Sequence, residues 1–200
     1  MSDEARRLPA YEIFALPAEF GGRLPRDMTP RQAQRYFTWF IDNIPNRLTG
    51  LQAVVGLNLD LSGESLAPLG EWFCSVIVGR RRTLDEIRSE MARWSKRSRE
   101  LGLPVDELTL TEESFSICID VGIYLGECYR RHLPDARWAL CTKPRNDISY
   151  HQPRIEGLEP HPIDPIRVTV SNGYLVAQGQ GHSGMFVEGY QWLAARNRTA

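Results

Sequence analysis

The segment 109–132 constrains the fold of this 200-residue chain more than any other part of it. Glu112 and Glu113 stand near its start and basic residues near its end, which is the charge order that a helix dipole favours. Either Thr109, paired with Glu112 in a capping box, or Thr111 supplies the N-cap. A proline two residues after the segment stops it. We therefore predict one long helix here.

Two glycines four residues apart, Gly122 and Gly126, lie in the middle of this helix. Each costs roughly 0.5 to 1 kcal/mol relative to alanine, so we expect another element to cross closely over that face. Membrane helix dimers have the same spacing, but a span needs about 20 consecutive apolar residues. Asp120 interrupts the apolar run, so no membrane span is expected.

A polar stripe lies on the opposite side of the helix, at 100° per residue. In it, Asp120 and Glu127 are about 10.5 Å apart along the axis, too far to share a proton and wide for one metal ion. They suit either recognition of a cationic or polar partner or structural bonds to arginine and backbone groups, and the structural alternative is favoured. The stripe comprises Glu113, Ser116, Asp120, Tyr124, Glu127 and Arg131.

Helical spacing of apolar residues runs through residues 29–132. The first helix begins with Thr29 as N-cap, Pro30 at the first helical position and Gln32 completing a capping box. Pro45 either ends this helix or begins the next. Together with the segment 109–132 we predict a five-helix body, whose other members start near Leu48, Glu64 and Thr83, the last with Glu86 as its box partner.

After the helical body the pattern changes to that of short strands. The clearest signal is alternation over 166–171, an Asn172-Gly173 pair typical of a type I′ turn, and a return over 174–178, which predicts an antiparallel hairpin. Two further short strands are expected at Trp138–Thr142 and Ile148–Tyr150, and an amphipathic helix at Met185–Arg196.

The predicted fold class is α+β. An N-terminal multi-helix body (about 29–132) precedes a small, mainly antiparallel β region (about 137–178) and a closing helix (about 185–196). Residues 1–28 are expected to form an extended lead-in, and no repeat or linker divides residues 29–200, which predicts a single domain. The lead-in residues that could dock on the body are Tyr11, Ile13, Phe14 and Leu16.

Composition excludes several classes of function. The net charge of −1 provides no general attraction for nucleic acid or an anionic membrane. The N-terminus lacks a signal-peptide pattern, so a cytoplasmic protein is expected.

The spacing of the cysteines contains no CxxC pattern, which favours reduced core thiols over a zinc site. Neither a metal nor a cofactor is predicted. The cysteines are Cys74, Cys118, Cys128 and Cys141.

Motifs of known chemistry are incomplete. The run 179–184 matches GxGxxG, but the 16 residues that follow leave no room for a second parallel strand. Ser183 has Met185 where a nucleophile elbow needs glycine, and no histidine follows in the required order. His151 and His161 lie near acidic residues, but ordinary loop polarity is favoured over a cation site. No catalytic residue is assigned.

A basic segment extends over residues 80–99, with eight basic and three acidic residues, a local charge of +5. Such a segment can bind phosphate groups or an acidic partner, because arginine pairs with both in a bidentate manner. A solvated helix face is favoured, with Arg88, Lys96 and Arg99 pointing outward.

The segment 116–127, SICIDVGIYLGE, resembles the SICxDxGxYxGE helix of an uncharacterised bacterial family. That family also has a Trp-containing strand, a Lys-Pro turn and an NxP-like strand, which resemble Trp138, Lys143-Pro144 and the stretch 146–153 here, the last only loosely. A YFxWF-type helix precedes them, as at Tyr36–Phe40. Proteins of this kind are similar to small cytosolic immunity proteins that neutralise bacterial toxins.

The resemblance implies a binding protein without catalysis, which occludes a toxin through direct protein contacts. Two alternatives stay open: an enzyme with a pocket between helix 109–132 and loops 143–165, using Asp120 or Glu127 with His151, and a subunit of a structural homo-oligomer. The oligomeric state is left open. The candidate partner-binding residues are Asp120, Tyr124, Glu127, Glu113, Arg88 and Lys96.

Overall fold

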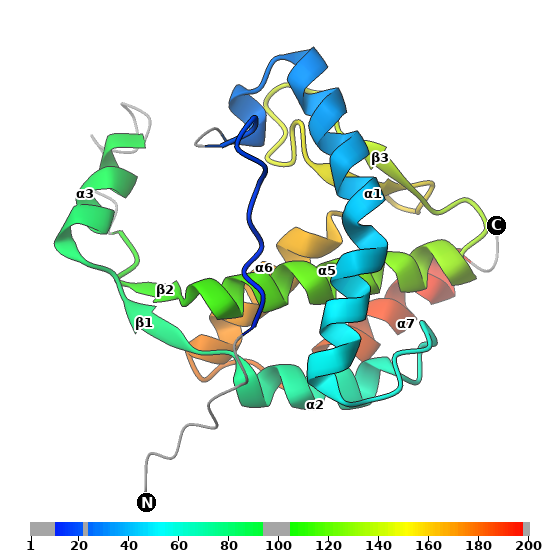
Figure 1. Cartoon of the computed structure of the whole chain (residues 1–200). Helices are drawn as coiled ribbons and strands as arrows, with labels where there is room; N and C mark the ends of the chain where they lie inside the picture. Colours follow the sequence, from blue (N-terminus) through cyan, green and yellow to red (C-terminus); the bar gives the residue numbers. More distant parts are fainter. Residues whose placement is uncertain (1–10, 22–23, 94–104, 198–200) are drawn as a thin grey trace, which may run out of the picture.

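The computed structural model describes residues 11–21, 24–93 and 105–197 and has an α+β fold (Figure 1). The predicted class is confirmed: helices dominate, small antiparallel sheets accompany them, and a helix ends the described chain. The described helices are η1 (Pro25–Asp27), α1 (Pro30–Val55), α2 (Leu66–Val76), α3 (Leu84–Arg93), α5 (Glu112–His132), α6 (Pro165–Ala177) and α7 (Met185–Asn197). The strands are β1 (Gly79–Arg81), β2 (Leu108–Leu110), β3 (Arg137–Leu140) and β4 (Pro153–Glu156).

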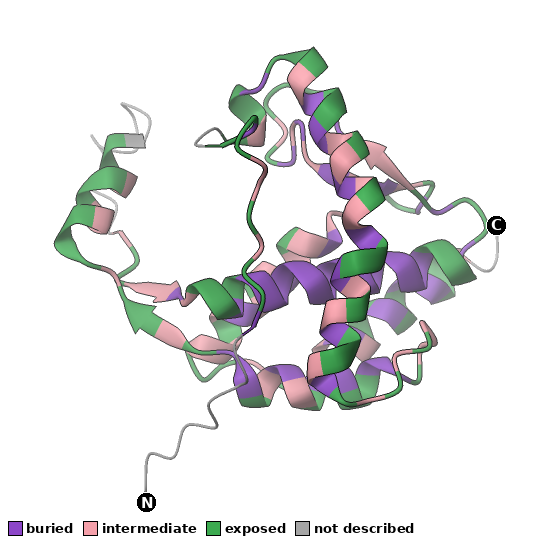
Figure 2. Cartoon of the chain, viewed as in Figure 1, coloured by how far each residue is buried: buried purple, intermediate pink, exposed green. Residues whose placement is uncertain are grey.

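Helix α5 is the centre of the molecule. It contacts α1, α6, β2, β3 and β4, and it is buried along most of its length (Figure 2). Of its two predicted starts the later one is correct, since Thr111 is the N-cap and its hydroxyl accepts a hydrogen bond from the amide of Ser114 at 3.2 Å. Thr109 belongs to β2 instead. The other elements are therefore arranged around one buried helix.

Helix α1 is a single helix, so the break predicted at Pro45 is wrong. The capping box of Thr29 and Gln32 is present as predicted. A proline inside a helix removes a hydrogen bond and costs about 3 kcal/mol. For this reason a proline in a sequence usually predicts a helix boundary. Here Pro45 is exposed, while Ile44 and Leu51 on either side of it are buried. Burial of that apolar face keeps the helix continuous.

The hairpin predicted over 166–178 is wrong, because these residues form α6. Asp164 is the N-cap, with its carboxylate accepting from the amide of Arg167, and Pro165 occupies the first helical position. The buried residues Pro165, Thr169 and Gly173 recur every four residues, which is helical spacing. Gly173 therefore serves packing against α5 and not a type I′ turn.

The described residues form two antiparallel sheets of two strands each. The strand expected at Trp138 exists as β3, but its partner is β4, while residues 148–150 form a turn. The pair of β1 and β2 was not predicted, because strands of three residues carry almost no periodicity. The chain continues from β1 into α3, which lies away from the other described elements (Figure 1). The closing helix is confirmed as α7.

The glycines of α5 allow the close crossing that their spacing predicts. A Cβ on Gly122 would lie 2.5 Å from the Cα of Ile166 in α6, and a Cβ on Gly126 would lie 2.3 Å from the ring of Trp138. From the other helix, a Cβ on Gly173 would lie 2.5 Å from the sulfur of Cys118. No helix in the described ranges has both the length and the apolarity to cross a bilayer.

The N-terminal segment 11–21 lies along the helical body, beside α1 and α5 (Figure 1). Tyr11 is buried, Phe14 and Leu16 are half-buried, and Ile13 is exposed. The amide of Phe14 donates to the hydroxyl of Ser116 at 2.9 Å. Docking of the lead-in is thus confirmed for Tyr11, Phe14 and Leu16, and the expectation for Ile13 is wrong.

The cysteines are free thiols in the interior or close to it. Cys118, Cys128 and Cys141 are buried, and Cys74 is half-buried. Burial raises the pKa of Cys118 and of Cys128 to about 12, so both thiols are protonated and unreactive at neutral pH. They act as small apolar residues of the core.

Replacing Gly122 with alanine is expected to lower the free energy of unfolding by at least about 1 kcal/mol, because the new methyl group collides with the backbone of α6. Gly50→Ala in α1 is the matched control, since nothing lies within 4 Å of its Cβ position. It should be neutral or stabilising by up to about 1 kcal/mol through higher helix propensity. Urea denaturation measures both, and equal stabilities would contradict the close crossing.

Candidate functional site

Asp120 is the centre of a buried hydrogen-bond network. Arg47 holds it in a bidentate manner, with Nε donating to Oδ1 and Nη2 donating to Oδ2, both at 2.7 Å. The hydroxyl of Tyr11 donates to Oδ2 at 2.5 Å. Asp120 is 1% exposed, so both oxygens are engaged out of contact with solvent. The structural alternative holds for this residue.

Arg47 and Asp120 form a buried ion pair. Burial raises the pKa of Asp120, and the hydrogen bonds from Arg47 and Tyr11 act against that rise. An arginine stays protonated in proteins, so Arg47 needs a counter-charge where it is buried. Its Nη2 atom also donates to the carbonyl oxygen of Glu12 at 3.0 Å. The network thereby joins the N-terminal segment, α1 and α5.

Tyr124 is buried as well, and its hydroxyl has two partners. It lies 2.6 Å from the hydroxyl oxygen of Ser65 and accepts from the amide of Leu61 at 2.9 Å. Burial raises its pKa to about 12. Tyr124 therefore fixes the loop between α1 and α2 to α5, and it offers no group to a partner.

Glu127 lies where the core meets the surface, and its carboxylate accepts hydrogen bonds from two side chains. Its Oε1 accepts from the indole Nε1 of Trp138 at 2.8 Å, and its Oε2 accepts from Nη2 of Arg130 at 2.7 Å. The carboxylate is largely buried, but it lines a shallow cavity of about 520 Å³ beside Trp138 and Arg130. Glu127 is thus first of all an anchor for β3.

The remaining sequence candidates lie apart from these residues. Glu113 is exposed near the start of α5. Arg88 is exposed on α3 and pairs with Asp85 of the same helix at 3.0 Å. Lys96 lies outside the described residues. The candidates within the described residues therefore do not form one surface.

The residues of the enzyme alternative are also separated. Asp120 lies in the buried network, Glu127 lines the cavity beside Trp138, and His151 lines another cavity beside α1. Neither of these two cavities is lined by all three residues. Among the described residues no group of three His, Cys, Asp or Glu side chains is placed to hold a metal ion.

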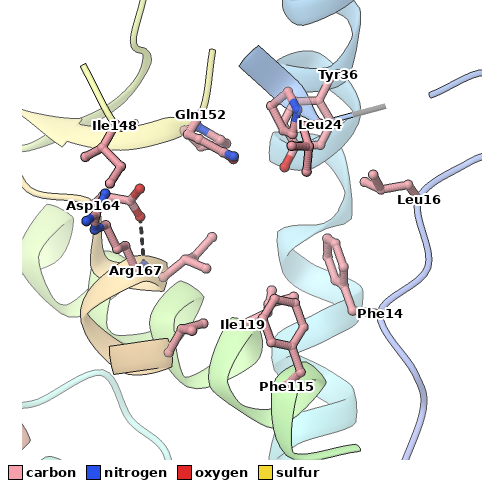
Figure 3. A pocket seen from close by; sticks show the side chains of 14 residues that line it. Phe14, Leu16, Leu24, Tyr36, Phe115, Ile119, Ile148, Gln152, Asp164 and Arg167 are labelled. Carbon is pink, nitrogen blue, oxygen red and sulfur yellow. Dashed lines mark hydrogen bonds between the residues drawn. The ribbon is translucent and has the colours of Figure 1, made fainter. Parts of the chain in front are cut away.

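An apolar cavity of about 470 Å³ does lie between α5 and the loops that follow β3 (Figure 3). We call it the apolar cavity. Its walls come from the N-terminal segment, α1, α5, the turn before β4 and α6. Its lining residues are Phe14, Leu16, Leu24, Pro25, Tyr36, Phe115, Ile119, Ile148, Gln152, Pro153, Asp164, Ile166, Arg167 and Val170.

Two charged residues accompany the apolar lining. Asp164 Oδ1 accepts from the amide of Arg167 at 3.0 Å (Figure 3). Its Oδ2 accepts from the hydroxyl of Ser149 at 3.0 Å. Burial raises the pKa of Asp164, opposed by these hydrogen bonds. Arg167 is exposed, and no ion pair between described residues includes its guanidinium. The cavity thus combines one fixed carboxylate with an exposed arginine.

Large apolar side chains form the rim of this cavity. Leu24, Phe115 and Ile148 are 48%, 45% and 64% exposed. Phe115 is exposed near the start of α5, although most of that helix is buried. Sequence patterns missed this site because its rim comes from three segments that are far apart in the chain.

Replacing Asp120 with asparagine is expected to lower the free energy of unfolding by about 3 to 5 kcal/mol, because the buried charge of Arg47 loses its partner. Glu113→Gln on the exposed part of the same helix is the control and should lower the stability by no more than about 1 kcal/mol, through the lost interaction with the helix dipole. Chemical denaturation followed by circular dichroism measures both. A stability loss for Asp120→Asn no larger than that of the control would contradict the structural role.

The chain matches no protein-family model, no curated protein and no solved structure with which it was compared.

Proposed function

We propose that this chain is a binding protein whose apolar cavity receives apolar side chains of a protein partner. The observation that carries the proposal is the rim: Leu24, Phe115 and Ile148 are each about half exposed or more, and all three line one cavity. Exposed apolar side chains that gather around one cavity offer a partner apolar surface to bury.

The energetics suit a protein interface. Burying a fully exposed large apolar side chain contributes roughly 1.5 to 3 kcal/mol. The three rim residues are already about half covered, so a partner that covers the rest gains roughly half of that from each, which supplies the apolar centre that binding hot spots need. A small molecule inside the cavity would leave the outward parts of these side chains in water, whereas a protein surface covers them. Arg167 and Asp164 beside the rim match the polar border of such interfaces.

The partner should present apolar side chains next to an acidic group. Arg167 is exposed, and no described carboxylate forms an ion pair with it, so an acidic residue of the partner gains a bidentate bond there. The resemblance of the segment 116–127 to proteins similar to immunity proteins supports a bacterial toxin as this partner. In that role the chain acts by covering a surface of the toxin and needs no catalytic group.

A binding experiment with rim variants tests the proposal. The chain, with Phe115→Glu and Ile148→Glu as separate variants, is used to capture the products of neighbouring genes and then to rescue cells from the captured protein's toxicity. Each variant should weaken binding at least roughly tenfold, since it puts a charge into the apolar centre of the interface. Calorimetry on the purified pair measures the affinities.

Leu175→Glu is the matched control, because Leu175 is similarly exposed but does not line the cavity. It should bind and rescue like the parent chain. Equal binding by the Phe115 and Ile148 variants would contradict this interface. Light scattering distinguishes a second copy of the chain as the occupant: a dimer that Phe115→Glu dissociates would replace the toxin proposal with the homo-oligomer.

A further inference from the structure

A second cavity, of about 460 Å³, lies between the start of α1 and the loop after β3. It has no lining residue in common with the apolar cavity. We call it the basic cavity because both cations in its lining come from the loop 141–151. Its lining residues are Pro30, Gln34, Leu140, Thr142, Lys143, Arg145, Tyr150 and His151.

The cations of the basic cavity are available to a ligand. Lys143 and Arg145 are exposed, and no ion pair between described residues includes either of them. The acidic residue of the same loop, Asp147, lies 3.5 Å from Nη1 of Arg154 and is partly neutralised there. The start of α1 adds the positive end of a 26-residue helix. The cavity therefore has an excess of positive charge.

His151 is the second, independent feature of this site. It is 2% exposed, and its backbone has a φ of 64°, in the left-handed region that residues other than glycine rarely adopt. Strain of this kind clusters at functional sites. Its ring stacks on Tyr150, with centroids 3.9 Å apart. Nδ1 lies 3.2 Å from the carbonyl oxygen of Pro25, which can only accept, so Nδ1 donates and Nε2 is left for a ligand.

We propose that the basic cavity binds a small organic phosphate. Its oxygens accept from Lys143, Arg145 and the hydroxyl of Thr142. A phosphate monoester loses its second proton near pH 6, so around that pH part of it is a monoanion with both acceptor oxygens and a hydroxyl donor, and this hydroxyl can donate to Nε2 of His151. A carboxylate lacks that donor.

The apolar part of the lining points to the rest of the ligand. Pro30, Leu140 and the ring of Tyr150 provide apolar walls, and the cavity is larger than a bare phosphate ion. A flat or apolar body attached to the phosphate would contact these walls while the phosphate meets the cations. The site is therefore expected to prefer an organic phosphate over inorganic phosphate.

Isothermal titration of the whole chain with phenyl phosphate, inorganic phosphate, benzoate and benzamide tests the proposal. Phenyl phosphate should bind most tightly, and its affinity should fall as salt is raised, because the contacts are between charges. Absence of saturable binding of phenyl phosphate by the folded chain would overturn the proposal. Benzoate or benzamide binding as tightly as phenyl phosphate would overturn the assignment to a phosphate.

Variants locate the binding. Lys143→Gln combined with Arg145→Gln should weaken phenyl phosphate binding at least roughly tenfold, since charge-assisted hydrogen bonds are lost. Arg31→Gln removes a neighbouring charge of α1 that does not line the cavity, and should leave the affinity within about twofold. A double variant that binds like the parent would place the phosphate elsewhere and refute the site.

His151→Asn provides a variant that keeps the fold, because asparagine tolerates the left-handed backbone. It should weaken phenyl phosphate binding while thermal melting shows a folded protein, and unchanged affinity would exclude His151 from the site. The proposal is independent of the protein partner: Phe115→Glu should leave phosphate binding unchanged.

Discussion

A charged residue in the middle of a helix that is buried on every side requires its counter-charge inside the protein. Asp120 meets this requirement through Arg47, which reaches it from α1 with two hydrogen bonds, and through Tyr11 from the N-terminal segment. The desolvation of two charges is offset only when such geometry is nearly ideal. The network therefore specifies how α1 and the N-terminal segment lie against α5, and the rest of the packing is arranged around that placement.

Sequence-based prediction was most accurate for elements whose caps, charges and packing residues all lie within the element itself. Helix α5 has its cap, its charge order and its packing glycines within itself, so its course and the close crossing over Gly122 were predictable. Helix α6 shows the opposite case, since Asn172-Gly173 between alternating residues is a strong hairpin signal. Burial of Thr169 and Gly173 against α5 overrides it. The cap and proline at Asp164-Pro165 were the local signal for the helix.

The functional surface was less predictable than the fold. Polar residues at helical spacing suggested a partner-binding stripe, but periodicity along one helix cannot show which distant segments cover it. Arg47 covers Asp120, Ser65 and Leu61 cover Tyr124, and Trp138 covers part of Glu127. The apolar cavity is instead assembled from several separate segments between residues 14 and 170. It lies between α5 and the following loops, and its lining includes none of Asp120, Glu127 and His151.

The segment 11–16 belongs to two structures at once. On one side Tyr11 and the carbonyl of Glu12 complete the coordination of the buried ion pair, and on the other Phe14 and Leu16 form a wall of the apolar cavity. Any molecule that contacts this wall binds only the docked form of the segment. By thermodynamic linkage, binding of such a molecule to the apolar cavity stabilises the docked segment and its hydrogen bonds to the ion pair. These hydrogen bonds in turn strengthen the binding by the same factor. The buried ion pair and the apolar cavity therefore both depend on one equilibrium, the docking of the segment 11–16 onto the helical body.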